Sequence, residues 1–366
     1  MMELVFFNLK RVTQGFKIDI LKTKGFYLKI LLLTLMGKTC MASSLHVKIE
    51  NLYYHIRIFE QLGKWFVFVT CLLLLISLTQ YIFKNRFKKA YSLKGKIYDW
   101  FVRFGFFAFT IGLGIRWFLA GHAPWSNQYE SMIFSAWACI LAGIILSRHS
   151  RLPLTSGGLL AGVILLIAHR ASIDSSFTPL PPVLKSKLMV THVSIAITGY
   201  GFFSVGTALA FCNLLVLALH FFGKENNLGK KVLIRSKITE QALWFGLLLI
   251  TLGSILGSIW ANEAWGRYWG WDPKESWTLI LILTYVLVLN LRLVIRHHWA
   301  YWLNVWSLFA FGALIMTYFG VNRFFSGMHT YGGQKGIQFT LILFWFIGIW
   351  IALSFLAYRN REIIKE

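Results

Sequence analysis

Tryptophan is concentrated in one short segment of this 366-residue chain. Four tryptophans, Trp260, Trp265, Trp269 and Trp271, lie within twelve residues that also contain two glycines. Tryptophan offers a broad aromatic surface, and glycine lets a ligand approach the backbone closely. A single tryptophan in a membrane protein is more often part of the aromatic belt at the interface. The concentration in one segment instead favours a surface for a large, flat, apolar ligand.

Histidine is the second residue type that could do chemistry. Four of the ten histidines lie at or near the ends of apolar segments on one side of the membrane: His122, His169, His192 and His329. A lone histidine in a membrane protein is more often an interhelical hydrogen-bonding group than a metal ligand. Several histidines on the same side as the tryptophan cluster favour ligation of a metal. A flat ligand with a central metal takes one axial imidazole on each face. Haem is such a ligand.

The acidic edge of haem needs cations, and the same segments supply them. Arg267 and Lys274 could neutralise the propionates, and Arg116 is a further candidate. Asp272 has a structural role that comes first, because Asp272, Pro273 and Glu275 have the spacing of a capping box at the start of a helix. Asn127 and Glu130 repeat that spacing before another apolar segment.

The elements that must position these residues are membrane-spanning helices. The chain is 57% apolar and 14% charged, with a mean hydropathy of +0.61, which excludes a soluble enzyme. Continuous apolar runs also exclude a β-barrel, whose strands alternate in polarity. The sequence predicts an all-α, polytopic bundle of about nine spans at 64–83, 101–120, 131–147, 155–170, 190–221, 239–259, 277–295, 302–322 and 338–357.

The formal net charge of +23 orients these spans. Every second connection together with the C-terminal tail, namely 84–100, 148–153, 222–238, 296–301 and 358–366, contains 17 lysines and arginines, against 6 in the other connections. By the positive-inside rule the first set faces the cytoplasm or its equivalent, and the tryptophan segment faces outward. The positive charge therefore reflects topology, and no nucleic-acid partner is expected.

The ends of the chain are less informative. Residues 1–63 form a basic N-terminal segment of unknown role with a short apolar stretch at 26–36 that resembles a signal-peptide core. We expect a transmembrane domain over 64–357 and a cytoplasmic tail over 358–366. Cys40 stays unassigned. Cys71, Cys139 and Cys212 lie in separate spans without metal-binding spacing and are expected to be packing residues.

Four blocks of the sequence resemble the CcsA/ResC group of cytochrome c assembly proteins, a family of haem-handling membrane proteins with a tryptophan-rich WWD motif. The similarity lies in Trp260 to Trp277, in 116–131, in 178–186 leading to His192, and in Gly-Val-Asn followed by Gly-Met-His-Thr-Tyr over 320–331. The blocks occur in the family's order on one predicted side and span about residues 64–330.

This resemblance implies a function that composition alone does not. Proteins of this family bind haem b as a substrate and present it on the outer side of the membrane. With a CcsB/ResB-type membrane subunit, they support its covalent attachment to the Cys-x-x-Cys-His motif of apocytochrome c. His192 and His329 match the family's two axial ligands, and the tryptophan segment matches the part that cradles haem. The resemblance also implies thiol-reducing partner proteins. It makes the chain the haem-presenting subunit of a haem lyase, in a bacterial inner membrane or a thylakoid.

One position departs from the family pattern. Many members carry a histidine within the span after the tryptophan segment, thought to hold haem during its passage from the inner side, where this chain has Asn290. Asparagine is a poor haem ligand, so an inner haem site is in doubt here. By depth, His220, His297 and His298 are the alternatives, and His220 is the hypothesised substitute.

Two other functions remain open at this stage. A haem exporter without ligase activity would use the same histidines and tryptophans. A membrane scaffold would use the tryptophans as an interfacial belt and the histidines as interhelical hydrogen-bonding groups.

Overall fold

A computed structural model of the chain describes residues 88–366, apart from 126, 149, 171–179, 181, 221–226, 330–338 and 365–366. The predicted span at 64–83, the signal-like stretch, Cys40 and Cys71 lie outside the described residues. All the described helices belong to one compact unit, Tyr53–Glu366.

The described part of the chain is helical, with no strand in it. Its long helices are α5 (Lys88–Ala120), α6 (Gln128–Leu146), α7 (Leu152–Arg170), α8 (Lys187–Leu219), α9 (Leu228–Trp265), α10 (Pro273–Val294), α11 (Trp299–Ile315) and α13 (Phe339–Tyr358). Short turns η1 (Pro182–Lys185), η3 (Met316–Gly320), α12 (Val321–Phe324) and η4 (Arg361–Ile363) complete the order. The predicted all-α fold is confirmed.

Six of the described helical segments are long and apolar enough to cross a membrane, from the one at Asp99–Phe118 to the one at Trp299–Phe324. Two further apolar helical segments are shorter, Leu152–Ala168 and Phe344–Tyr358. Eight predicted spans thus correspond to described helices, and the predicted number of spans is roughly consistent with the structure. The protein is an integral membrane protein, and many of its exposed side chains on α9 and α10 are apolar.

Polar caps begin three of these helices, two of them at the positions that the sequence predicts. The Asn127 side chain accepts a hydrogen bond from the Glu130 N–H (2.8 Å) at the start of α6. Ser186 caps α8, and Asp272 with Glu275 forms a complete capping box at the start of α10. Each cap satisfies backbone N–H groups that the helix itself leaves without a partner.

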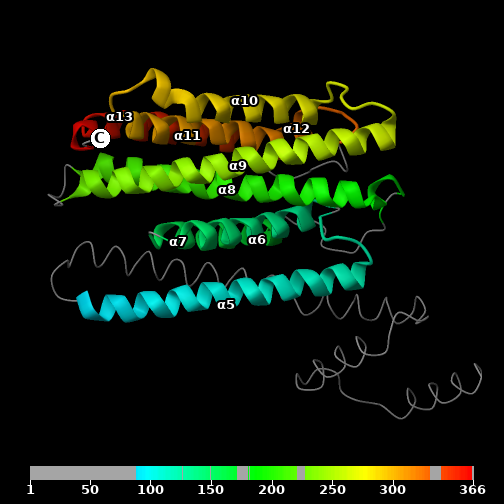
Figure 1. Cartoon of the computed structure of the whole chain (residues 1–366), viewed down its shortest axis with the longest axis horizontal. Helices are drawn as coiled ribbons and strands as arrows, with labels where there is room; N and C mark the ends of the chain where they lie inside the picture. The colour runs from blue at the N-terminus through cyan, green and yellow to red at the C-terminus, as the bar shows by residue number, and fades with distance from the viewer. Residues whose placement is uncertain are drawn as a thin grey trace, which may run out of the picture. The chain divides into compact units, whose positions relative to one another are not determined.

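Helix α8 lies at the centre of the arrangement and packs against α6, α7, α9, α11 and α13. Figure 1 shows α8 and α9 running alongside each other, with α10 and α11 beyond α9. The loop from α9 to α10, which carries the tryptophan segment, therefore lies at one end of the helices, and the turn from α10 to α11 lies at the other.

Buried polar contacts connect the helices. Arg116 of α5 pairs with Glu130 of α6 at 2.9 Å, and both side chains are almost fully buried. Asn304 of α11 bonds to Asn213 of α8 (3.1 Å) and to Ser236 of α9 (2.7 Å). Such contacts are typical of hydrogen bonding between membrane helices.

The cysteine predictions can be compared with the structure at two positions. Cys139 and Cys212 are free thiols, the first buried and the second half-buried within their helices.

Candidate haem-binding cavity

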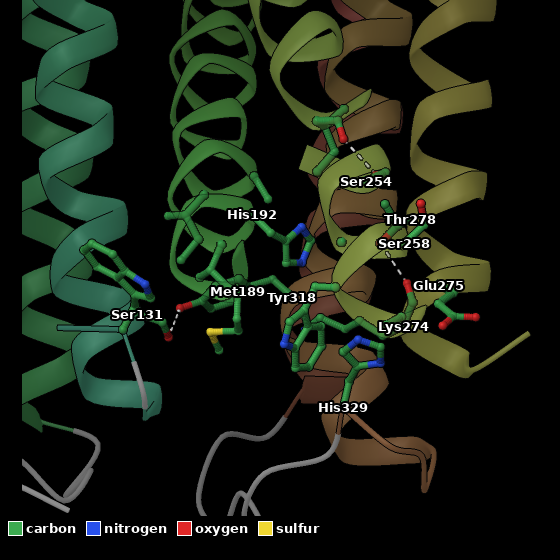
Figure 2. A pocket seen from close by; sticks show the side chains of 18 of the residues that line it. Ser131, Met189, His192, Ser254, Ser258, Lys274, Glu275, Thr278, Tyr318 and His329 are labelled. Atoms are coloured by element: carbon green, nitrogen blue, oxygen red, sulfur yellow. Dashed lines mark hydrogen bonds between the residues drawn. The ribbon is translucent and has the colours of Figure 1, made fainter. Parts of the chain in front are cut away.

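A cavity lies at the end of the helices that carries the tryptophan segment. Its volume is about 220 Å³, a little below the ~300–1,000 Å³ of an ordinary small-molecule site. Helices α6, α8, α9, α10 and α12, the turn η3, and the loop before α10 contribute to its wall. Figure 2 shows His192, Lys274 and His329 among the side chains of this wall.

His192 enters the cavity from α8. Its Nδ1 lies 2.6 Å from the carbonyl oxygen of Gly253 on α9, so Nδ1 carries the proton and Nε2 is the free ring nitrogen. Gly257 makes room for the ring, because a Cβ there would lie 2.5 Å from a ring carbon of His192. The close contact of α8 and α9 thus fixes the orientation of this imidazole.

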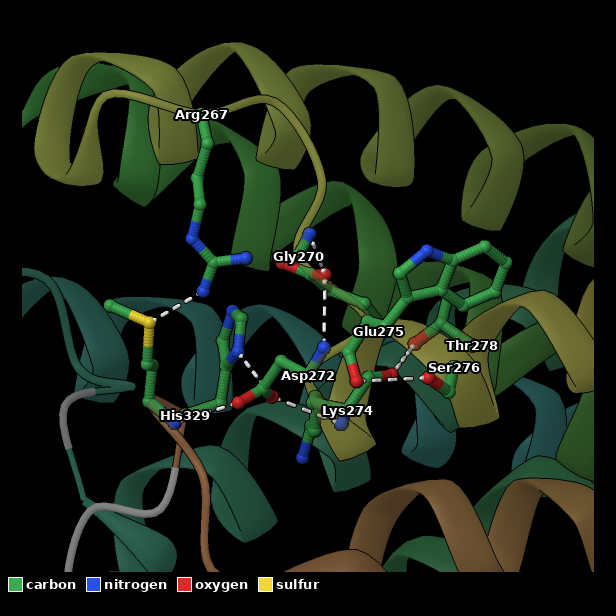
Figure 3. Close-up of polar contacts among 10 residues, drawn as sticks. Arg267, Gly270, Asp272, Lys274, Glu275, Ser276, Thr278 and His329 are labelled. Atoms are coloured by element: carbon green, nitrogen blue, oxygen red, sulfur yellow. Dashed lines mark hydrogen bonds and ion pairs between the residues drawn. The ribbon is translucent and has the colours of Figure 1, made fainter.

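His329 enters from the segment after α12, 137 residues further along the chain. Its Nδ1 lies 2.9 Å from Asp272 Oδ2. Figure 3 shows this contact, together with the hydrogen bond that the Lys274 N–H donates to the same carboxylate. The Met328 N–H donates to Asp272 Oδ1 at 2.7 Å. The start of α10 therefore anchors the segment that presents His329.

Burial and hydrogen bonding shift the pKa values of His329 and Asp272 in opposite directions. Burial lowers the pKa of His329 more than its contact with Asp272 raises it, so the pKa lies below 6.5 and the imidazole is neutral at neutral pH. Burial raises the pKa of Asp272, but the hydrogen bonds from His329, Met328 and Lys274 together outweigh it, and the pKa lies below 3.8. A neutral imidazole beside a carboxylate is the form that ligates a metal through Nε2.

The four clustered tryptophans divide into two pairs. Trp260 and Trp265 pack edge to face with ring centroids 4.8 Å apart, and Trp265 contacts His329 at 5.1 Å in the same way. Trp269 and Trp271 form a second edge-to-face pair at 5.8 Å. Trp260 is 3% exposed and Trp271 is 70% exposed. Trp260 and Trp269 line the cavity, so the cluster supplies both a buried support and an exposed rim.

The backbone of Trp271 adopts the left-handed region (φ 57°), which is unusual for a bulky residue. Glu275 holds this turn, because its carboxylate accepts the N–H groups of Gly270 (2.8 Å) and Asp272 (3.2 Å), on either side of Trp271. Figure 3 shows the contact with Gly270. The capping box thus also shapes the exposed tryptophan turn.

The predicted cations are distributed unevenly. Lys274 lines the cavity, and its ammonium group has no hydrogen-bond or ion-pair partner among the described residues. The Arg267 guanidinium points to the sulfur of Met328 and lies outside the cavity lining. Arg116 is also absent from the lining, and its guanidinium group forms the buried ion pair with Glu130. Of the three, Lys274 is the one placed to meet an anionic ligand.

The structure describes the side chain of one of the other two histidines predicted to lie on the outward side. His122 contacts the Ala123 carbonyl oxygen through Nδ1 (3.1 Å) and does not line the cavity. The side chain of His169 lies outside the described residues. His192 and His329 are therefore the two of these four histidines that the structure places in the cavity lining.

Sequence reasoning missed a group of hydroxyl-bearing side chains in the cavity wall. They are Ser131, Tyr200, Ser254, Ser258, Thr278 and Tyr318. A spacing of four residues places Ser254 and Ser258 on one face of α9, and the step of eight from His192 places Tyr200 on the same face of α8. That periodicity was the available signal, but it does not reveal which face lines a cavity.

The inner candidates lie far from this cavity. His220 ends α8, about 42 Å along the helix axis from His192. His298 is in the turn before α11 and contacts Glu362. The exposed Asn290 donates to the Val286 carbonyl of its own helix. The described contacts do not assemble these residues into a second site, and the hypothesis of His220 as an inner ligand stays a prediction.

The sequence matches known proteins over the region that builds the cavity. Residues 125–329 match the family model described as cytochrome C assembly protein. The chain is 37% identical over 334 residues to "Protein NrfI" of Wolinella succinogenes, a match that covers 89% of this chain and 36% of that protein. It is 32% identical over 293 residues to "Cytochrome c biogenesis protein CcsA" of Guillardia theta, covering 72% of this chain and 94% of the relative. The corresponding protein of Prochlorococcus marinus (strain NATL2A) is 33% identical over 255 residues, covering 61% and 81%.

Proposed function

Since this chain belongs to the cytochrome c assembly protein family, we propose that it binds haem b as a substrate between His192 and His329. In this proposal the protein presents the haem on the outer side of the membrane. With a membrane subunit of the CcsB/ResB type, it supports the covalent attachment of haem to the Cys-x-x-Cys-His motif of apocytochrome c. The chain spans about a third of NrfI, so the activity of a complete assembly is part of the proposal.

The arrangement of the two histidines is the observation that carries this proposal. Both line one cavity, although 137 residues separate them in the chain. The Nδ1 of each ring has a protein oxygen within 2.9 Å, which leaves Nε2 for a ligand. One imidazole on each face would make the haem iron six-coordinate with two nitrogen axial ligands.

The other wall residues suit the same ligand. Lys274 supplies a cation for a propionate, and Trp269 supplies an aromatic surface beside the opening. We propose supporting roles for Trp260 and Trp265 behind His329, and for Trp271, Arg267 and Asp272 around the tryptophan turn. Arg116 and His122 do not line the cavity, and their roles at the site stay predictions.

The chemistry of attachment needs positioning more than acid–base catalysis. In thioether formation each cysteine S–H adds across one haem vinyl group: a carbon–sulfur bond forms, and the proton goes to the other vinyl carbon. Holding vinyl groups and thiols together can supply much of the acceleration. The axial histidines keep the iron ligated until the histidine of the substrate motif replaces one of them. Reduced thiols are supplied by thiol-reducing partner proteins in a bacterial inner membrane or a thylakoid.

Absorbance spectroscopy tests the binding step. We expect the detergent-purified protein, with haem added, to show the spectrum of low-spin haem with two nitrogen ligands. His192→Ala and His329→Ala should each lose that spectrum, while the matched control His122→Ala keeps it. A wild-type protein without a haem spectrum would favour a membrane scaffold. A spectrum that stays unchanged in both cavity variants would contradict ligation by His192 and His329.

A second measurement separates attachment from export. The protein with its partner subunit is mixed with reduced haem and a Cys-x-x-Cys-His peptide, and covalent haem is detected by mass. We expect a haem-peptide adduct with both thiols consumed. Haem binding without adduct in the presence of the partner would support the exporter alternative.

A further inference from the structure

We propose that Asp272 is a positioning residue for His329 that sets the electronic character of this axial ligand, in addition to capping α10. This inference rests on the proposed haem site. It concerns how the protein makes the two histidines unequal, which family membership does not state.

The carboxylate of Asp272 is in direct contact with the imidazole of His329. Asp272 Oδ2 lies 2.9 Å from His329 Nδ1, and its side chain is 4% exposed. The carboxylate is itself held, because the Lys274 N–H (3.1 Å) and the Met328 N–H (2.7 Å) both donate to it. A buried, immobilised acceptor selects one tautomer of the imidazole, with the proton on Nδ1 and Nε2 free.

Packing around the His329 ring and Asp272 supports this contact. The ring of Trp265 stands at 88° to the His329 ring with centroids 5.1 Å apart, which limits rotation of the imidazole. Gly327 lets the chain approach Asp272, since a Cβ there would lie 2.4 Å from Oδ1. The segment that carries His329 is therefore fitted to the carboxylate.

The Nδ1 of His192 has a different kind of partner from that of His329. The oxygen at its Nδ1 is a neutral backbone carbonyl, that of Gly253. A carboxylate partner makes an imidazole a stronger electron donor than a neutral partner does, and a ring with more imidazolate character stabilises ferric over ferrous iron. His329 is thus the more strongly donating of the two ligands.

Capping alone does not explain the arrangement. One side-chain oxygen satisfies an N-cap, and asparagine caps as well as aspartate. Asp272 uses both oxygens and accepts from the imidazole and from Met328 as well as from α10. Asp272→Asn is therefore the informative variant, because it retains the cap while it removes the negative charge from Nδ1.

The experiment measures the reduction potential and spectrum of haem added to the purified full chain. We expect Asp272→Asn to weaken ferric relative to ferrous haem binding about tenfold, which for one electron raises the potential by about 59 mV. Ser186→Ala removes the N-cap from the helix that carries His192, and it should leave the potential unchanged.

A double-mutant cycle excludes a merely structural effect. In a His329→Ala background, Asp272→Asn should produce no further shift, because the two residues act as one unit. An equal shift in both backgrounds, or no shift in either, overturns the inference while leaving the haem site intact. Wild-type protein that binds no haem overturns the proposed function, and this inference with it.

Discussion

His329 is the residue whose charge depends most directly on its surroundings in the cavity. Burial disfavours its imidazolium, whereas Asp272 favours it, and burial prevails. The neighbouring Lys274 adds to the effect of burial, and Glu275 adds to that of Asp272. The histidine is therefore kept neutral in the folded state.

This balance predicts how stability depends on pH. In the unfolded chain His329 titrates near 6.5, and in the folded protein it titrates lower. Below pH 6.5 the unfolded state therefore binds more protons, and stability is lost as the pH falls toward the folded pKa. We expect the Tm of haem-free protein in detergent to fall less between pH 7.5 and 5.5 in His329→Gln than in wild type. Equal slopes would contradict this prediction.

Lys274 leads to a prediction about the ligand's acidic groups. Lys274 lines the cavity, and a charge-assisted hydrogen bond contributes about 1.5–3 kcal/mol. Lys274→Met should weaken haem binding by roughly tenfold or more in a haem titration. Arg267→Met, outside the lining, should have a smaller effect. Haem with both propionates esterified should bind wild type and Lys274→Met alike; a difference would place the lysine elsewhere on the ligand.

At the scale of elements, the contact of α8 with α9 determines where His192 points. Gly253 presents the carbonyl that accepts from the imidazole, and Gly257 leaves room for the ring. A side chain at 257 would overlap the imidazole directly.

Gly257→Ala should therefore displace the His192 imidazole. We expect loss of the low-spin spectrum and a destabilisation of about 1–3 kcal/mol, as for other overpacked sites. Gly114→Ala on α5 is a suitable control, because nothing lies within 4 Å of the Cβ it would add. Unaltered haem ligation in Gly257→Ala would show that the close approach of α9 does not orient His192.

The Arg116–Glu130 pair joins α5 to α6 away from the cavity lining. Removing one partner of a buried ion pair leaves an uncompensated charge, so Glu130→Ala should destabilise the protein by about 3–5 kcal/mol. Replacing both by apolar residues, Arg116→Met with Glu130→Leu, should recover most of that loss. Thermal unfolding measures the stability of the single and the double variant. The haem affinity of the double variant should match that of wild type. A specific loss of haem affinity there would return Arg116 to the ligand site.

At the scale of the whole molecule, the distribution of basic residues predicts the side on which the cavity opens. The C-terminal tail belongs to the strongly basic set of connections, and the tryptophan segment belongs to the sparsely charged set. Reporter fusions in the producing cell should place residue 366 on the cytoplasmic side and an insertion between residues 267 and 268 on the outer side. The opposite result would invert the proposed direction of haem presentation.

Much of the architecture could be predicted from local sequence. Apolar runs located eight of the described helices, because the cost of exposing backbone groups to lipid makes each run helical by itself. The spacing of Asp272 to Glu275 and of Asn127 to Glu130 located two helix starts, since a cap depends on residues only three positions apart. The gathering of histidine and tryptophan on one side follows from counting spans.

The composition of the cavity depended on the packing of distant segments. Local patterns do not determine which faces of α8 and α9 meet, because both helices are apolar nearly all round. The tertiary structure brings His329 to Asp272 and places His192 in the same cavity. It also pairs Arg116, one of the predicted haem cations, with Glu130 in a buried ion pair. Sequence alone determined the fold class, the approximate positions of the apolar helices and the types of residue available for ligation. Tertiary structure decided their partners, because hydrogen bonds require angstrom-scale proximity between residues that lie far apart in the chain, 61 positions for His192 and Gly253 and 57 for His329 and Asp272.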